Sequence, residues 1–98
     1  AIKKRTPHVT IEALIPDFDA REELILQVVN AGAEVVSHNM ETVRRLTPST
    51  RSRAKYDTSL KTLKIISASK ARSKSGIMLG IGEKEEEVIE VMNDLRNV

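Results

Sequence analysis

The sequence predicts an α/β protein built from three consecutive strand–helix (βα) units with parallel strands. Apolar, β-branched segments alternate three times with segments of helical periodicity along the 98 residues, an order that implies parallel pairing through right-handed crossovers. Two of the expected strands end in polar or glycine-rich segments, at residues 37–42 and 74–83. Ligands bind at the carboxyl ends of parallel strands, so we expect one shared pocket there.

The first unit is expected at residues 9–32. Residues 9–16 are rich in β-branched and aliphatic side chains and stop at a proline, which favours a strand. Asp19 is expected to cap the following helix, with Glu22 as its capping-box partner. Gly32 can end that helix in the left-handed conformation. The apolar stripe of the helix consists of Ile25, Val28 and Val29.

The second unit has a short strand at 33–37, directly followed by His38 and Asn39, and a brief helix at 41–46. Residues 47–50 contain a proline between hydroxyl side chains and indicate a turn. The next helix is expected to bury one face, which carries Tyr56, Leu60, Leu63 and Ile66.

The third unit follows a small, polar segment at 67–73, which we expect to be a loop. The third strand is expected at 75–81, ended by Gly80 and Gly82. The last helix is expected at 84–96, with three glutamates in its first turn, where the helix dipole favours negative charge. Its apolar stripe consists of Val88, Val91, Met92 and Leu95.

Three parallel strands with helices on one side leave the other face of the sheet bare, and a barrel needs more strands than this chain contains. The chain is therefore either part of a larger barrel or a small open sheet protected by self-association. The exposed edges and inner face predict a dimer that joins two half-barrels, or a loose monomer with weak amide protection in the outer strands.

Composition narrows the classes of function. Charged residues make up 31% of the chain and hydrophobic residues 40%, as in an ordinary single domain. Phe18 and Tyr56 are the only Phe, Tyr or Trp residues, so a stacking platform for single-stranded nucleic acid is not supported. No apolar run is long enough to cross a membrane, and there is no cysteine for a disulfide, a thiol nucleophile or a Cys-ligated cluster.

Charge is unevenly distributed along the chain. Residues 44–74 are strongly basic and residues 83–94 are acidic. Two interpretations stay open: solvated helix faces, or a basic rim that attracts an anionic ligand or an acidic protein partner.

The chain resembles the lipoyl synthase family over nearly its whole length, because five motifs occur in the order and spacing of that family. They are Ile15-Pro16-Asp17-Phe18, His38-Asn39-Met40-Glu41-Thr42, Tyr56-Asp57-Thr58-Ser59-Leu60, Lys74-Ser75-Gly76-Ile77-Met78-Leu79-Gly80-Ile81-Gly82-Glu83 and Met92-Asn93-Asp94-Leu95-Arg96. The resemblance implies a partial (β/α)6 TIM-type barrel of the radical S-adenosylmethionine superfamily. Such enzymes insert sulfur at C6 and C8 of an octanoyl chain carried on an acceptor protein.

The resemblance also implies what these residues lack. In the family, two cysteine triads precede the matched region and a serine cluster ligand follows it. Residues 1–98 are therefore expected to be one segment, the central part of the barrel, inactive alone and without either [4Fe–4S] cluster. The implied partner is the octanoylated lipoyl-carrier protein, without nucleic acid or membrane. The implied location is the bacterial cytoplasm, or the mitochondrion or plastid of a eukaryote.

The resemblance places part of an S-adenosylmethionine site on this chain and no catalytic residue. Asn39 and Glu41 correspond to the ribose-binding motif, and an amide beside a carboxylate suits a vicinal diol. The alternative is that Glu41 caps the short helix and Asn39 satisfies a turn. His38 is expected to be a hydrogen-bonded structural residue.

Two further pairs of residues complete the implied site. Met78 and Gly80 lie in the segment that supports adenine in the family, where glycine permits close backbone approach. Arg51 and Lys74 match a family arginine and lysine, and either could neutralise the methionine carboxylate; the alternative is that both are simply solvated.

Two other functions stay open. Biotin synthase, of the same superfamily, has a similar His-Asn motif and glycine-rich strand, but Lys74-Ser75-Gly76 and Ile15-Pro16-Asp17-Phe18 favour lipoyl synthase. The chain could also be a stand-alone, non-catalytic α/β binding module. A CxxxCxxC motif in the flanking gene sequence would distinguish the enzyme segment from the module.

Overall fold

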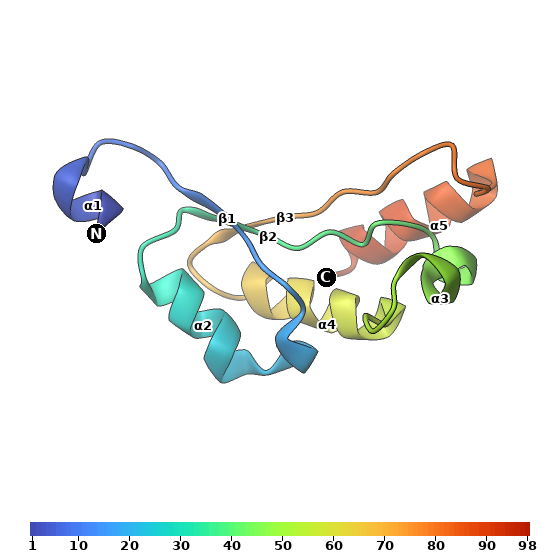
Figure 1. Ribbon diagram of the computed structural model, residues 1–98, viewed down its shortest axis with the longest axis horizontal. Coiled ribbons are helices and arrows are strands. Elements are labelled where there is room, and N and C mark those ends of the chain that lie inside the picture. Colours follow the sequence, from blue (N-terminus) through green and yellow to red (C-terminus); the bar gives the residue numbers. More distant parts are fainter.

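The computed structural model describes residues 1–98 and contains one parallel sheet with strand order β1-β2-β3 (Figure 1). The strands are β1 (Glu12–Leu14), β2 (Val35–Ser37) and β3 (Arg72–Lys74). Helices α2 (Glu22–Asn30) and α4 (Tyr56–Ser67) connect them and lie together on one side of the sheet. The expected fold class of parallel βα units is confirmed.

The remaining elements are short, except for the last helix. They are α1 (Ile2–Arg5), the 3₁₀ turns η1 (Phe18–Ala20) and η2 (Arg44–Leu46), α3 (Thr47–Thr50) and α5 (Glu85–Arg96). None of the helices has the length and apolar character needed to cross a bilayer.

The core lies between the sheet and the two connecting helices, and it is aliphatic. Ile25 and Val29 of α2, Val36 of β2 and Ile66 of α4 are each at most 1% exposed. Burying an aliphatic side chain of this size stabilises the fold by about 1.5–3 kcal/mol. The stripes expected on these helices therefore hold them against one face of the sheet.

The opposite face of the sheet carries no helix (Figure 1). Side chains alternate between faces along a strand, and Leu14, which faces away from the helices, is 67% exposed. Beside it, the Lys74 ammonium on β3 lies 3.0 Å from both carboxylate oxygens of Glu12 on β1. Because β2 lies between these strands, the ion pair crosses over Ser37, the register partner of both Leu14 and Lys74. The hydrogen bond that Lys74 donates to Glu12 lowers the pKa of the Glu12 carboxyl.

The third strand differs from the sequence prediction. It is β3, whose first two residues belong to the segment expected to be a loop, whereas residues 75–81 form no strand. Their only sheet-like contact is a single parallel bridge between Ile77 and Glu41. Strand pairing explains the difference. Residues 72–74 pair with β2 residue by residue, whereas residues 75–81 have only one pairing partner, Glu41, in the chain after β2.

The start of α2 also differs from the prediction, because the expected capping box of Asp19 and Glu22 does not form. The helix begins at Glu22, and its N-cap residue is Arg21. Asp19 instead adopts a left-handed φ of +54°, and its N–H donates to the Asp17 carboxylate at 2.9 Å. At the other end of α2, Gly32 has a φ of +111°, which confirms the expected left-handed helix end.

The short elements within residues 41–50 differ from the prediction. The helix expected at 41–46 is only the 3₁₀ turn η2, and the turn expected at 47–50 is the short helix α3. Pro48 lies in the first turn of α3, where proline needs no N–H partner and its φ suits a helix.

Helices α4 and α5 occur where they were expected. In α5, Val91 is 1% exposed and contributes to the core, but Met92 is 62% exposed, so its assignment to the buried stripe was wrong. The Tyr56 hydroxyl of α4 donates to the Asp94 carboxylate of α5 at 2.6 Å. This bond connects the last helix to the rest of the fold. Burial, and then this bond, raise the pKa of Tyr56.

Candidate functional site

A pocket of about 350 Å³ lies at the carboxyl ends of β1 and β2, where the sequence predicts a ligand site. The chain after β1 contributes one wall, the chain after β2 a second, and the end of α3 a third. The lining residues are Leu14, Ile15, Pro16, His38, Asn39, Glu41 and Arg51. Three of the six expected site residues, Asn39, Glu41 and Arg51, therefore meet in one pocket.

Asn39 and Glu41 both line this pocket, and the side chain of neither makes a hydrogen bond within the protein. The alternative role of Glu41 as a helix cap is wrong, because η2 begins after Val43 and has no side-chain cap. An amide and a carboxylate without protein partners can together bind adjacent hydroxyl groups of a ligand.

The backbone of Glu41 has a left-handed φ of +67°, unusual for a residue other than glycine. Its N–H donates to the Gly76 carbonyl at 3.2 Å, and its carbonyl accepts from the Met78 N–H at 2.8 Å. These two bonds hold the segment after β3 against the segment after β2. The structure thus brings Met78 beside Glu41, although Met78 lies outside the lining of the pocket.

Gly80 lies further out, in a turn with a φ of +91° and open space where a Cβ would stand. The Glu83 carboxylate accepts from the N–H groups of Gly80 and Ile81, and these bonds lower its pKa. The side chain of Met78 is 44% exposed. Both residues expected to support adenine are therefore accessible, on a segment that the backbone bonds of Glu41 and the Glu83 carboxylate hold in place.

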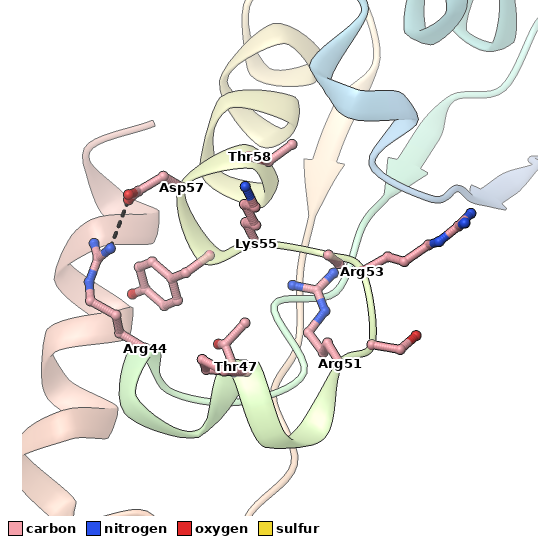
Figure 2. Close-up of a pocket in the computed structure, with 11 residues that line it drawn as sticks. Arg44, Thr47, Arg51, Arg53, Lys55, Asp57 and Thr58 are labelled. Atoms are coloured by element: carbon pink, nitrogen blue, oxygen red, sulfur yellow. Dashed lines mark hydrogen bonds and ion pairs between the residues drawn. The ribbon is translucent and has the colours of Figure 1, made fainter.

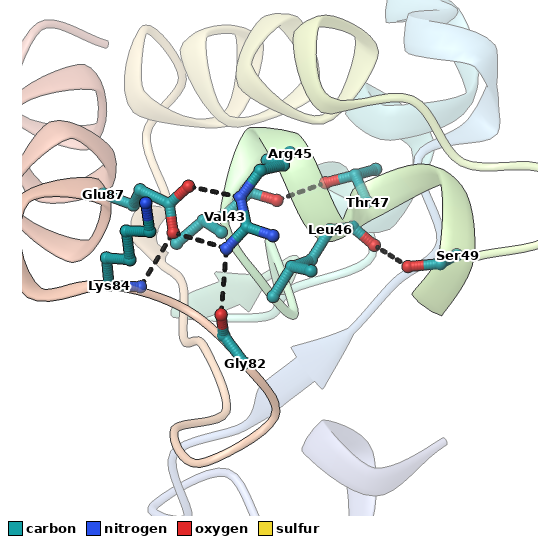
Figure 3. A network of polar contacts seen from close by, with 8 residues as sticks. All are labelled: Val43, Arg45, Leu46, Thr47, Ser49, Gly82, Lys84 and Glu87. Carbon is teal, nitrogen blue, oxygen red and sulfur yellow. Dashed lines mark hydrogen bonds and ion pairs between the residues drawn. The ribbon is translucent and has the colours of Figure 1, made fainter.

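The far end of this segment is fixed by Arg45 of η2 (Figure 3). Its guanidinium donates to both Glu87 carboxylate oxygens, at 2.7 and 3.1 Å, and to the Gly82 carbonyl at 2.9 Å. The Lys84 N–H also donates to Glu87, at 2.7 Å. These partners, Arg45 first, lower the pKa of Glu87 to about 2.

Arg51 lies between the first pocket and a second one of about 530 Å³, because it lines both. The second pocket is strongly basic (Figure 2). In it, Arg44 donates to Asp57 at 2.9 Å and stacks over the Tyr56 ring, 4.1 Å from its centroid. The other lining residues are Thr47, Pro48, Ser52, Arg53, Ala54, Lys55 and Thr58.

Lys74 lies on a different surface from the other expected site residues. It pairs with Glu12 on the open face of the sheet and does not line the pocket of Asn39 and Glu41. Arg51 is therefore the better placed of the two cations expected to bind a carboxylate.

His38 is 3% exposed and hydrogen-bonded at both ring nitrogens, as expected of a structural histidine. Nδ1 lies 3.0 Å from the Ile15 carbonyl oxygen, and Nε2 lies 2.8 Å from the Ser59 hydroxyl. Burial lowers its pKa, so the neutral imidazole is favoured. The same Ser59 hydroxyl accepts from Arg51 Nη1 at 2.8 Å.

The sequence analysis missed Ser59, and the signal was present. Ser59 and Thr62 lie on the same face of α4 as Leu63 and Ile66, and all four are buried. Buried hydroxyl groups need hydrogen-bond partners, so a serine within an apolar helical stripe indicates a polar contact in the interior.

The residues present fit an organic ligand and not a metal cluster. The chain contains no cysteine, and no three His, Cys, Asp or Glu side chains group closely enough to hold a metal ion. Iron–sulfur clusters are held by thiolates, so these residues could not supply such ligands. Asn39, Glu41 and Arg51 could hold a ligand that carries hydroxyl groups and an anion.

Comparison with known proteins agrees with the motifs. Residues 1–95 match the family model described as "Radical SAM superfamily". The whole chain is 57% identical to a protein named lipoyl synthase from Treponema denticola, and covers 34% of that relative. A lipoyl synthase from Parabacteroides distasonis is 53% identical over 96% of this chain, and covers 34% of the relative. A mitochondrial lipoyl synthase from Nematostella vectensis is 52% identical over 99% of this chain, again with 34% of the relative covered. The chain thus spans about a third of the length of these relatives.

Proposed function

The chain belongs to the radical SAM superfamily, and from this premise we propose that it is the central barrel segment of a lipoyl synthase. The complete enzyme would insert sulfur at C6 and C8 of an octanoyl chain bound to a carrier protein. S-adenosylmethionine, together with [4Fe–4S] clusters held elsewhere in the enzyme, would supply the radical chemistry. The 98 residues would contribute part of the S-adenosylmethionine pocket and be inactive alone.

The main structural support for this proposal is the pair Asn39 and Glu41. Both line one pocket, and neither side chain has a hydrogen-bond partner within the protein. In the proposed complex the Glu41 carboxylate accepts hydrogen bonds from the ribose hydroxyls, and the Asn39 amide donates or accepts beside it. The high identity to lipoyl synthases favours this function over that of biotin synthase or a stand-alone module.

The remaining site residues take distinct roles in the proposal. Met78 offers an exposed thioether and backbone beside Glu41, suited to the flat face of adenine. Gly80 leaves open the space that a side chain would fill. Arg51 binds the methionine carboxylate at the edge of the pocket. Lys74 can contribute only if its contact with Glu12 is exchanged for one with the ligand.

The test uses the full-length protein that carries this sequence, anaerobically reconstituted with iron and sulfide. With S-adenosylmethionine and an octanoylated carrier domain, mass spectrometry should show the carrier gaining two sulfur atoms. Glu41→Gln should weaken binding of S-adenosylmethionine by about tenfold, the scale of a hydrogen bond to a charged group. Glu86→Gln, which changes an exposed glutamate in α5, is the matched control and should have no effect. A carrier that gains no sulfur would contradict the proposed activity.

The partner and location follow from the same proposal. The octanoylated lipoyl-carrier protein is the proposed macromolecular substrate, without nucleic acid or membrane. Relatives occur in bacteria, and one is named mitochondrial, so we propose the cytoplasm in a bacterial source and the mitochondrion or plastid in a eukaryotic one.

Self-association is proposed for the isolated 98-residue chain, because no helix covers the open sheet face and Leu14 on it is exposed. Sedimentation equilibrium should show a dimer, or else a monomer with weak amide protection in β1 and β3. Leu14→Lys should shift a dimer toward monomer. A monomer with strong protection in both strands would instead favour the stand-alone module.

A further inference from the structure

The contacts of His38 form a chain of hydrogen bonds with a single direction. The Ile15 carbonyl can only accept, so His38 Nδ1, 3.0 Å away, must carry the proton. The neutral ring then offers Nε2 as an acceptor, and the Ser59 hydroxyl, at 2.8 Å, must donate to it. With its proton committed, the Ser59 oxygen is free to accept from Arg51 Nη1, also at 2.8 Å.

This chain of bonds ends at a guanidinium that still has donors available. Arg51 uses Nη1 for Ser59 and, at 3.4 Å, for the Met40 carbonyl, and its Nε and Nη2 donate to no protein atom. Arg51 is also the residue shared by the linings of the two pockets. Figure 2 shows its side chain rising from the end of α3 into the larger pocket.

We propose that His38 and Ser59 are positioning residues that hold the Arg51 guanidinium ready for the carboxylate of the ligand bound at Asn39 and Glu41. This inference rests on the proposed function. It adds an explanation of how the protein recognises the carboxylate group of the ligand. Ser59 lacks solvent exposure. His38 lines the pocket, but both of its ring nitrogens are engaged by protein groups, so both residues act on the carboxylate through Arg51.

A neutral network is well suited to this task. A charged histidine would repel the Arg51 cation and would carry a second N–H donor, at Nε2, whereas the neutral ring accepts there a hydrogen bond that orients Ser59. Holding a long, flexible arginine in one conformation before binding removes part of the entropy cost of ordering it on binding.

The experiment compares two ligands, S-adenosylmethionine and its decarboxylated analogue, in competition binding to the reconstituted full-length protein. Arg51→Met should weaken S-adenosylmethionine binding about tenfold or more, and Ser59→Ala about threefold to tenfold. Binding of the decarboxylated analogue should change less than twofold in both variants. The double variant should match Arg51→Met alone, because Ser59 acts through Arg51.

Thr62→Val is the matched control, since it removes another buried hydroxyl of α4 that bonds to the Asp17 and Thr58 carbonyls. It should affect neither ligand. The inference is overturned if Ser59→Ala weakens both ligands equally, or if its effect adds to that of Arg51→Met. A wild-type protein that binds the decarboxylated analogue but not S-adenosylmethionine also overturns it. Failure to bind either ligand overturns the proposed function first, and this inference with it.

A second measurement needs no variant. Nitrogen NMR of histidine-labelled protein should show His38 as the neutral Nδ1–H tautomer at pH 7. The Nε2–H tautomer or a charged ring would break the required direction of the hydrogen bonds and overturn the inference even if Ser59→Ala fails to fold.

Discussion

The two faces of the sheet are built differently. The helical face buries Val36 completely, in a core cluster that includes Val29 of α2 and Ile66 of α4. The open face carries an ion pair between Glu12 and Lys74, and Leu14 is 67% exposed. The first face therefore supplies most of the stability of this chain, whereas the second contributes little unless something covers it.

This difference separates stability from ligand binding within 98 residues. Ile25 and Ile66, which hold the helices to the sheet, lie outside the lining of the candidate pocket. Asn39 and Glu41, whose side chains make no hydrogen bonds within the protein, line it. His38 belongs to both regions, because it is buried and also lines the pocket.

The largest expected effect is on the helical face. Ile66→Ala removes a side chain without solvent exposure and should lower the free energy of unfolding by about 2–5 kcal/mol, because a cavity remains. Leu14→Ala on the open face should change it by less than about 0.5 kcal/mol. Urea unfolding of both variants checks this contrast. Equal losses would mean that the open face is covered by another copy of the chain.

The next effect concerns the contact between α4 and α5. Tyr56→Phe removes the 2.6 Å hydrogen bond to Asp94 and leaves the ring in place. We expect the free energy of unfolding to fall by about 1.5–3 kcal/mol, as for hydrogen bonds to charged groups. Hydrogen exchange should show greater opening of α5 than of α2. Uniform loss of protection across both helices would contradict a local role for this bond.

A smaller effect should appear on acidification. Burial lowers the pKa of His38 below its ordinary value of 6.5, so the unfolded chain takes up a proton that the folded chain does not. Stability should therefore fall as the pH drops below about 6.5, by at most about 1.4 kcal/mol per pH unit. The decline ends once the pH passes below the folded pKa. Unfolding curves between pH 7.5 and 5 measure this slope, and His38→Gln should flatten it.

The smallest effect is expected from the open face. Lys74→Met removes the main cause of the lowered pKa of Glu12, which should rise toward 4.5 in a carbon-detected NMR titration. The unfolding midpoint near pH 7 should hardly move, because exposed ion pairs contribute little. A large drop in the midpoint would show that the pair is buried in an interface, and would sharpen the case for self-association.

Sequence patterns predicted the helices better than the strands. Helices α2, α4 and α5 have apolar side chains at helical spacing, which is a local property. Strand β3 has the sequence Arg-Ser-Lys and contains no apolar residue, so only its pairing with β2 reveals it. Residues 75–81 have a strand-like composition but lack a partner beyond the bridge at Ile77.

The candidate site was predictable to the extent that its residues follow strand ends. Asn39 and Glu41 come directly after β2, and the resemblance to a known family pointed to Arg51. The role of Ser59 required the tertiary structure, because its partners His38 and Arg51 are brought to it by two other segments. The separate position of Lys74 also required the tertiary structure, since β3 directs its side chain to Glu12 on another strand.

The left-handed backbone of Glu41 affects how this position would respond to selection. Such a conformation costs a residue with a side chain about 1–2 kcal/mol relative to glycine. A library selected only for thermal resistance should therefore accumulate glycine or asparagine at position 41. A library selected for ligand capture should retain glutamate despite that cost. Sequencing the two populations would reveal whether glutamate at position 41 is maintained for stability or for ligand binding.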